Sequence, residues 1–227
     1  MLPKFDQIVF YTKFLADIYE KYYGVSAKKI NIILNPVFRR ESPEVERAAE
    51  PTVLFAGRFV AYKNLELVIR VFDKVRSKIG RGRLIMIGEG PDKEKLDKII
   101  KGLPSAADIK MIPKMNQEKL FEHISLSTVG IGPALTEFNP NFILECLSLG
   151  KPVLISRENG LSVKLPEEFL FDVDVGSEQE LEIKLANFFD EIFYQKALET
   201  VSNLQLNQTW QDVIRGHLNV LKSVGFS

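Results

Sequence analysis

The sequence is poor in the residues that build disulfides and metal sites. Its 227 residues include one cysteine, Cys146, and two histidines, His123 and His217. A single cysteine excludes an internal disulfide and any cysteine-rich metal site. The histidines lie far apart in the sequence and neither belongs to a metal-ligand motif. We therefore expect no metal, and we interpret Cys146, which has apolar neighbours, as a core residue.

The sequence also lacks an excess of charge and a long apolar run. Thirty basic residues balance thirty acidic ones, whereas nucleic-acid binders usually carry a basic excess, so we expect no nucleic-acid partner. Asp6, Lys13 and Asp17 interrupt the apolar N-terminal stretch, which is unlike a signal peptide. No run approaches the roughly 20 apolar residues of a membrane span. These features predict a soluble cytoplasmic protein, and peripheral work at a membrane surface stays open.

Short apolar runs alternate with amphipathic segments through the middle of the chain. The expected strands are Val53–Ala56, Arg83–Ile87, Ile109–Ile112, Val129–Gly132, Pro152–Ile155 and Phe169–Val173. The expected helices are Asn64–Ile79, Asp92–Lys101, Asn116–Ser125, Asn141–Leu149 and Glu178–Phe189. This alternation predicts an α/β fold, a Rossmann-like parallel sheet with helices on both faces.

The composition divides the chain into four parts. Residues 1–38 contain a predicted helix and strand, Tyr11–Tyr23 and Ile30–Leu34, which look like the end of another unit. Residues 39–50 are charged and poor in apolar side chains, as linkers are. We expect the compact domain over residues 51–190 and further helices over residues 191–227.

Two stripes of apolar residues at helical spacing lie in the last fifty residues. The first consists of Leu181, Leu185, Phe188, Phe189, Ile192 and Phe193. The second consists of Trp210, Val213, Ile214, His217, Leu218 and Leu221. We interpret both as helix faces that pack on a core, with binding to a membrane surface as the alternative.

Ligands of an open parallel sheet bind beyond the carboxyl ends of its strands, so the segments there are the candidate site. Gly57 ends the first predicted strand, and Arg58 and Lys63 follow before a helix that Asn64 can cap. A guanidinium and an ammonium in one loop suit a phosphate. Two cations in a loop also fit an ordinary solvated surface.

Glycines follow the second predicted strand in the segment Gly88-Glu89-Gly90-Pro91. They would let a ligand approach the backbone, although an ordinary tight turn explains them as well. Lys93 occupies the place of the third glycine of a dinucleotide fingerprint. This difference argues against an oxidoreductase that binds a nicotinamide or flavin.

Two glutamates and a helix start follow the strand predicted at Val129–Gly132. With Asn139 as cap and Pro140 as first helical residue, the free amides of the helix would suit a phosphate. Glu137 and Glu145 could accept hydrogen bonds from the hydroxyls of a polyol. Solvated charge is the alternative for each, but Glu145 has apolar neighbours in sequence, and a glutamate is rarely buried without a partner or a function.

Four segments together resemble a known family. They are Phe55-Ala56-Gly57-Arg58 with Lys63, Ile87-Gly88-Glu89-Gly90-Pro91, Glu137 with Glu145, and Leu149-Gly150-Lys151-Pro152-Val153. Their order and spacing resemble the C-terminal, donor-binding domain of GT-B glycosyltransferases of the retaining, family-4 type (glycosyl transferases group 1). Tyr11–Val37 resembles the last helix and strand of the N-terminal domain of these enzymes, and Trp210 resembles the start of their closing helix.

The resemblance implies a role for each candidate residue. Arg58 and Lys63 would neutralise the diphosphate of a nucleotide-sugar, Glu137 would contact the donor sugar, and Glu145 would bind the ribose. Further donor contacts would come from Gly57, Gly88, Gly90, Ile112, Pro113, Phe138, Asn139 and Asn141. No metal or other cofactor is implied, because the cations and a helix N-terminus supply the positive potential.

The sequence departs from the family pattern at several points. Asn64 and Pro113 stand where the family usually has glycine, and Phe138-Asn139-Pro140-Asn141 replaces a small, glycine-containing stretch. Most of the N-terminal, acceptor-binding domain is not in the sequence. A separate N-terminal domain or a homo-oligomer would then complete the site for an acceptor, a glycan or lipid-linked sugar. The alternative is a nucleotide-sugar-binding module without catalysis.

Overall fold

A six-stranded parallel sheet forms the centre of the molecule. The computed structural model describes residues 5–43, 48–174 and 177–226. The strand order is β6-β5-β4-β7-β8-β9, and each neighbouring pair is parallel. The strands span Thr52–Ala56 (β4), Arg83–Ile87 (β5), Ile109–Ile112 (β6), Val129–Gly132 (β7), Val153–Ser156 (β8) and Leu170–Phe171 (β9). Their central members are continuous buried runs, as expected for a parallel sheet covered on both faces.

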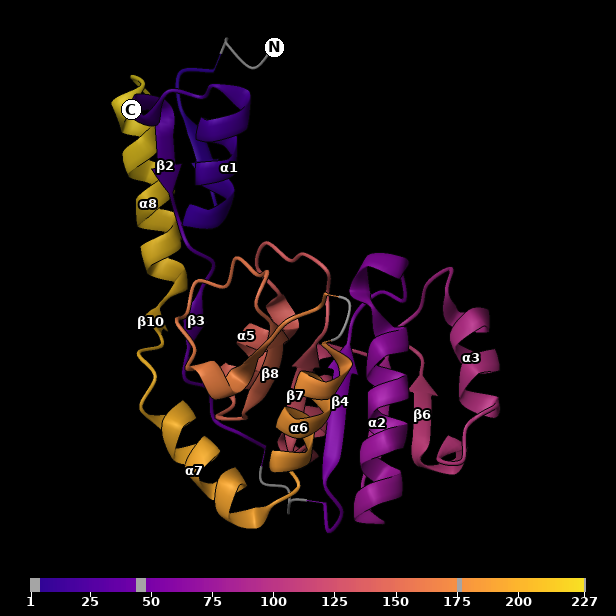
Figure 1. Cartoon of the computed structure of the whole chain (residues 1–227). Helices are drawn as coiled ribbons and strands as arrows, with labels where there is room; N and C mark the ends of the chain where they lie inside the picture. The colour runs from indigo at the N-terminus through magenta and orange to yellow at the C-terminus, as the bar shows by residue number, and fades with distance from the viewer. Residues whose placement is uncertain (1–4, 44–47, 175–176, 227) are drawn as a thin grey trace.

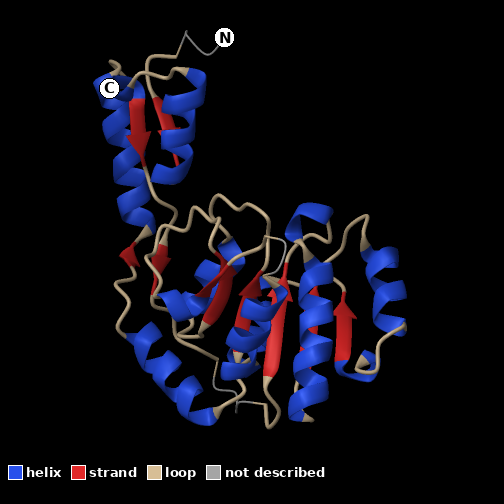
Figure 2. Cartoon of the chain, viewed as in Figure 1, coloured by secondary structure: helices blue, strands red, loops and turns tan. Residues whose placement is uncertain are grey.

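Helices cover both faces of this sheet, which confirms the Rossmann-like α/β prediction (Figures 1 and 2). They span Leu65–Ile79 (α2), Lys93–Lys101 (α3), Gln117–Leu126 (α4), Asn141–Ser148 (α5), Glu178–Asn187 (α6) and Glu191–Ser202 (α7). Short 3₁₀ turns lie at Ala27–Lys29, Ala61–Lys63, Ala106–Asp108 and Glu167–Phe169. The chain runs outward from β4 to β6 and then returns to β7, so right-handed crossovers place α2 and α3 on one face and α4 and α5 on the other.

A small lobe stands beside the main sheet. It consists of β1 (Ile8–Phe10), α1 (Lys13–Tyr23), β2 (Ile30–Ile32) and the C-terminal helix α8 (Trp210–Ser223). Strands β1 and β2 form a two-stranded parallel sheet. The strand β1 was not predicted from the sequence. Figure 1 shows α8 alongside β2, and a Cβ added to Gly216 would lie 3.2 Å from the Ile33 side chain, so the helix packs closely here.

The C-terminal segment is not one helical stretch. Helix α7 ends at Ser202, and α8 begins only at Trp210, with Thr209 and Asp212 forming a capping box. Between them, β10 (Asn207–Gln208) pairs antiparallel with β3 (Val37–Phe38). The prediction of helix through residues 203–209 is therefore wrong, because this segment bonds to the chain leaving the small lobe.

The two apolar stripes have different environments. In the first, Leu181, Leu185, Phe188 and Phe189 are buried in the main core, although Ile192 is exposed. In the second, α8 has no buried residue, and Trp210, Ile214, Leu218 and Leu221 are all exposed. The prediction of core packing is wrong for α8, because this helix lies alongside β2 in the small lobe (Figure 1) and none of its residues is buried.

The predicted linker, residues 39–50, is attached to the main domain where the structure describes it. The Arg39 guanidinium donates to the carbonyl oxygen of Leu147 at 3.1 Å and also to that of Val201, and burial lowers the pKa of Arg39. The Arg40 amide donates to the Ser148 carbonyl at 2.9 Å. Residues 44–47 lie outside the described residues. The predicted linker therefore uses the charged side chain of Arg39 to bind carbonyl groups near the ends of α5 and α7.

Candidate functional site

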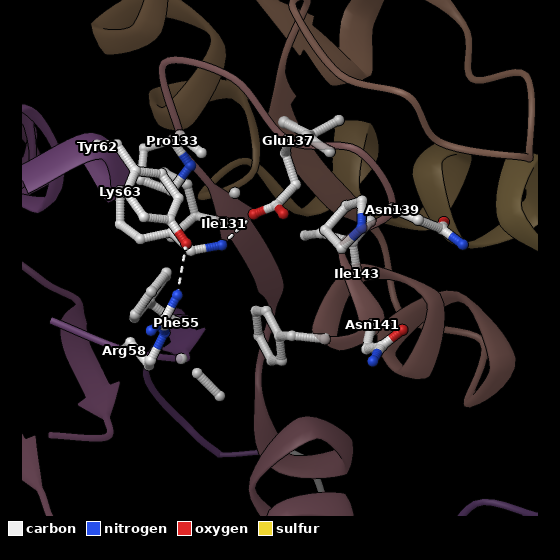
Figure 3. A pocket seen from close by; sticks show the side chains of 17 residues that line it. Phe55, Arg58, Tyr62, Lys63, Ile131, Pro133, Glu137, Asn139, Asn141 and Ile143 are labelled. Atoms are coloured by element: carbon white, nitrogen blue, oxygen red, sulfur yellow. Dashed lines mark hydrogen bonds and ion pairs between the residues drawn. The ribbon is translucent and has the colours of Figure 1, made fainter. Parts of the chain in front are cut away.

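Two adjoining hollows open at the carboxyl ends of the central strands. The chain reverses its direction across the sheet between β4 and β7, which is where ligands of open α/β sheets bind. The first hollow, about 280 Å³, lies at the ends of β4, β7 and β8, and the second, about 500 Å³, lies at the ends of β4 and β5. Ala56, Gly57, Arg58 and Phe142 line both, so the two hollows form one cleft. Figure 3 shows the first hollow.

The two cations of the first loop have different surroundings. Arg58 is exposed, and its Nη2 donates to the Tyr62 hydroxyl at 3.1 Å. Lys63 is mostly buried, and its Nζ forms an ion pair with Oε2 of Glu137 across the hollow, as Figure 3 shows. Asn64 follows with a φ of 52°, in the left-handed region that glycine and asparagine tolerate. Asparagine can therefore replace the family glycine without changing the backbone.

The loop that carries Glu137 is fixed from two sides. The Leu135 amide donates to the Tyr62 carbonyl at 2.8 Å, which ties this loop to the one that carries Lys63. On the other side, the Gly160 amide donates to the Glu137 carbonyl at 2.6 Å. A Cβ on Gly160 would lie 2.4 Å from the Phe138 carbonyl oxygen, so a larger residue would push these loops apart. The Lys63–Glu137 contact therefore rests on backbone hydrogen bonds.

Helix α5 begins at Asn141, as the predicted range Asn141–Leu149 has it, and one residue after the start that the capping interpretation gave. Pro140 has an extended ψ of 101° and is the N-cap, and Asn141 is the first helical residue, so the assignment of Asn139 as cap is wrong. The lost proline N–H therefore lies outside the helix, and the first helical residues, Asn141, Phe142 and Ile143, line the hollow. Their amides have no partner within the helix and suit a phosphate. Figure 3 shows the Asn139 amide directed away from the Lys63–Glu137 pair.

Glu145 lies at the wall of the second hollow. Its Oε1 accepts a hydrogen bond from Gln117 Nε2 at 3.2 Å. Burial raises the pKa of the Glu145 carboxyl, and the Gln117 hydrogen bond and the Arg40 charge act in the opposite direction. The remaining wall is largely apolar, from Met115, Leu120 and Phe142. A carboxylate beside an apolar wall can bind the hydroxyls of a ligand whose ring packs on that wall.

Most of the predicted site residues come together in this cleft. Gly57, Arg58, Lys63, Glu137, Asn139 and Asn141 line the first hollow, and Gly57, Arg58, Gly88 and Glu145 line the second. Gly88 is needed there because a Cβ would lie 1.9 Å from the Gly57 carbonyl oxygen. The structure thus brings residues from three distant segments to one edge of the sheet.

Four predicted residues line neither hollow. Gly90 packs on Phe59, whose carbonyl oxygen would be 2.2 Å from an added Cβ. Phe138 turns to Phe14 of the small lobe, with 6.2 Å between ring centroids. The wall expected from Ile112 and Pro113 is instead formed by the next two residues in the chain, Lys114 and Met115.

Several lining residues were missed by the sequence analysis. Tyr62, Phe142 and Leu120 all contribute to the walls of the cleft. For Phe142 a signal existed, because it lies three positions before Glu145 and so shares its helix face. Tyr62 and Leu120 had no comparable signal.

The described residues contain neither a group of metal ligands nor a membrane-spanning helix. Among residues 5–43, 48–174 and 177–226, no three or more His, Cys, Asp or Glu side chains are grouped to hold a metal ion. In the same ranges, no helix has the length and apolar content needed to cross a membrane.

Curated relatives of the chain are sugar transferases. The chain is 29% identical to sulfoquinovosyl transferase SQD2 of Arabidopsis thaliana over 138 residues, which are 59% of this chain and 26% of that protein. It is 27% identical to alpha-D-kanosaminyltransferase of Streptomyces kanamyceticus over 118 residues, 52% of this chain and 30% of that protein. The chain thus spans about a third or less of the length of these relatives.

Solved GT-B glycosyltransferases share the fold. The lipopolysaccharide outer core galactosyltransferase WaaB aligns with a TM-score of 0.72 at 17% identity, over 96% of this chain and 62% of that one. The pneumococcal O-GlcNAc transferase GtfA, in complex with UDP and GlcNAc, aligns with a TM-score of 0.77 at 12% identity, over 97% and 46%. The family model for glycosyl transferases group 1 matches residues 38–191, which hold the whole cleft. The chain therefore belongs to the glycosyl transferases group 1 family.

Proposed function

We propose that this chain is the donor-binding half of a hexosyltransferase. In this role it binds a nucleotide-diphosphate sugar, whose sugar passes with retention to an acceptor glycan or lipid-linked sugar. The observation that carries the proposal is the cleft at the reversal between β4 and β7. There Arg58, Lys63 and the start of α5 provide positive potential beside the carboxylates of Glu137 and Glu145.

The chemistry of each wall assigns a part of the donor to it. The diphosphate lies over Arg58 and the first amides of α5, within reach of Lys63, and these groups stabilise the negative charge that develops on the leaving group. The donor sugar lies beside Glu137. The nucleoside occupies the larger hollow, where its ribose hydroxyls donate to Glu145 and its base packs on Met115 and Leu120.

The comparisons support this class of donor. Sulfoquinovosyl and kanosaminyl transferases are named for the sugars that they transfer. The pneumococcal structure contains UDP and GlcNAc, so a relative of this fold holds a nucleotide and a sugar together. We propose that the same cleft takes both parts of the donor here.

The acceptor lies on a partner domain in this proposal. The described part of the small lobe has two parallel strands, whereas parallel sheets are stable when both faces are covered. A further N-terminal domain, in the same polypeptide or a separate one, or a second copy of the chain would extend this lobe and face the cleft. We place the assembly in the cytoplasm, with peripheral contact to a membrane if the acceptor is lipid-linked.

Calorimetry with UDP, GDP and ADP, with and without EDTA, tests the donor site. We expect at least one of the three to bind, and the affinity to persist after chelation, because protein cations provide the charge. Arg58→Ala should weaken binding, and Arg83→Ala is the matched control, since Arg83 is an exposed arginine at the start of β5, the opposite end of the strands. Loss of all binding in EDTA, or equal effects of the two variants, contradicts the proposal.

The alternative is a nucleotide-sugar-binding module without catalysis. The small size of the described N-terminal lobe favours it, because the lobe provides little surface for an acceptor. The two functions differ in turnover: both bind donor, and only the first transfers sugar when a matching N-terminal domain is supplied.

A further inference from the structure

We propose that Glu137 makes the cleft select nucleotide-sugars over bare nucleoside diphosphates. In the free protein this carboxylate holds Lys63, and it releases the ammonium only when sugar hydroxyls replace it. The inference rests on the proposed donor site, and it adds a selectivity that the diphosphate contacts alone would not provide.

The pair is enclosed and well supported. The Lys63 and Glu137 side chains are 17% and 18% exposed, so water screens their interaction only in part. They come from different strand ends, and the Leu135–Tyr62 backbone bond of 2.8 Å holds their loops together. Lys63 and Glu137 are therefore paired in the free protein. A ligand that binds at this position interacts with both charges.

Arg58 provides the contrast. Its guanidinium bonds to the neutral Tyr62 hydroxyl, and no carboxylate pairs with it among the residues that the structure describes. A phosphate can therefore bind Arg58 without displacing a carboxylate that is paired with it. A phosphate near Lys63 is attracted by the ammonium and repelled by Glu137, and if it removes Lys63 it leaves a mostly buried carboxylate unpaired, which is unfavourable.

Two ligands meet this arrangement differently. The outer phosphate of a nucleoside diphosphate is a terminal, unesterified group with up to two negative charges, and no sugar hydroxyl accompanies it to donate to Glu137. In a nucleotide-sugar the same phosphate is esterified and carries one charge. The sugar hydroxyls beside it can donate to Glu137, so Lys63 can turn to the diphosphate while the carboxylate keeps hydrogen-bond partners.

The same difference acts after transfer. When the sugar has left, the product diphosphate has gained charge and the hydroxyl donors have gone. Glu137 then competes with the phosphate for Lys63, and the ion pair of the free protein re-forms as the product leaves. One carboxylate thus favours entry of the donor and departure of the product.

The experiment measures the affinities of nucleoside diphosphates and of their hexose conjugates by calorimetry, for the wild type and for Glu137→Gln. We expect Glu137→Gln to bind the bare diphosphate about tenfold more tightly and the conjugate no more tightly, so that the ratio of the two affinities changes about tenfold. Glu66→Gln is the matched control, because Glu66 also pairs with a lysine, Lys95, but lies outside the cleft. It should leave both affinities unchanged.

Each outcome has one meaning. A wild type that binds no nucleotide overturns the proposed function, and this inference with it. If the wild type binds nucleotides but Glu137→Gln leaves the diphosphate affinity unchanged or weakens it, the inference alone is overturned. Glu137→Asp keeps the negative charge but moves it away from Lys63. It should give a ratio of diphosphate to conjugate affinity between those of the wild type and Glu137→Gln. It serves as the test if the glutamine variant does not fold.

Discussion

Replacing Gly88 by alanine is expected to damage both the fold and the cleft. Gly88 follows β5 with a φ of 151°, and an added Cβ would lie 1.9 Å from the carbonyl oxygen of Gly57. That oxygen belongs to the backbone at the end of the neighbouring strand, so it cannot move aside as a flexible side chain can. Gly80 is the matched control, because it has a φ of 80° and nothing within 4 Å of an added Cβ.

The two substitutions separate backbone strain from the close contact. In Gly80→Ala, the left-handed conformation costs about 1–2 kcal/mol, partly offset by the roughly 0.4–1 kcal/mol that alanine gains in the unfolded chain. Gly88→Ala has a similar strain plus overpacking of about 1–3 kcal/mol. We therefore expect losses near 1 kcal/mol for Gly80→Ala and about 3 kcal/mol for Gly88→Ala. At ~2–4 °C per kcal/mol, these correspond to falls in Tm of about 2–4 and 6–12 °C.

Thermal unfolding and nucleotide titration of both variants provide the test. Gly57 and Gly88 both line the larger hollow, so relief of the contact should also reshape that wall and weaken nucleoside affinity. Gly80→Ala should leave the affinity unchanged. If both variants lose equal stability, or if Gly88→Ala keeps full affinity, the close approach of these two backbones does not shape the cleft.

Four more predictions concern charge, pH and turnover. Arg58→Ala should weaken nucleoside diphosphate binding, and Lys63→Ala should weaken nucleotide-sugar binding, each by about 1.5–3 kcal/mol, roughly 10- to 150-fold in Kd by calorimetry; unchanged affinity would remove that residue from the site. Glu145→Ala should weaken the binding of nucleosides as well as that of nucleotides. Unchanged nucleoside affinity would mean that this residue does not face the ribose. Because burial raises the pKa of Glu145 in the folded state, its ionised form opposes folding, and stability falls as pH rises from the ordinary value of 4.5 through the raised one. Glu145→Gln should therefore raise Tm at pH 7 and not below pH ~4, where both side chains are neutral; a gain that is equal at both pH values refutes this sign. The chain alone should transfer sugar slowly, since holding donor and acceptor together can supply about 7–11 kcal/mol of the barrier, and fusion to a matching N-terminal domain should restore the rate; efficient transfer by the chain alone would place an acceptor site within it.

The main sheet could be predicted because its strands are buried on both faces. Runs such as Val53–Ala56 and Val129–Gly132 are apolar throughout, and the helices between them have one apolar face, so the two patterns differ clearly. The surroundings of α8 could not be predicted in this way. Periodicity shows that Trp210 and Ile214 share a face, but not which surface, if any, covers that face.

The candidate site was predictable where strand ends converge. Arg58 and Glu137 follow neighbouring strands, so knowledge of the sheet order brings them to one edge. The errors lie where the path of a turn decides which residue faces inward. Pro113 begins such a turn, and the wall is formed by Met115 two positions later. Spacing in the sequence does not determine the direction of a side chain within an irregular segment.

The short pairing of β3 with β10 has a mechanical consequence. Two stretches of chain connect the main sheet with the small lobe, one leaving through Val37–Phe38 and one returning through Asn207–Gln208. Because these two connecting segments are hydrogen-bonded to each other where they pass, the connection should resist torsion and stretching more than bending. Any reorientation of the lobe relative to the main sheet must therefore bend this crossing or break the pairing of β3 with β10.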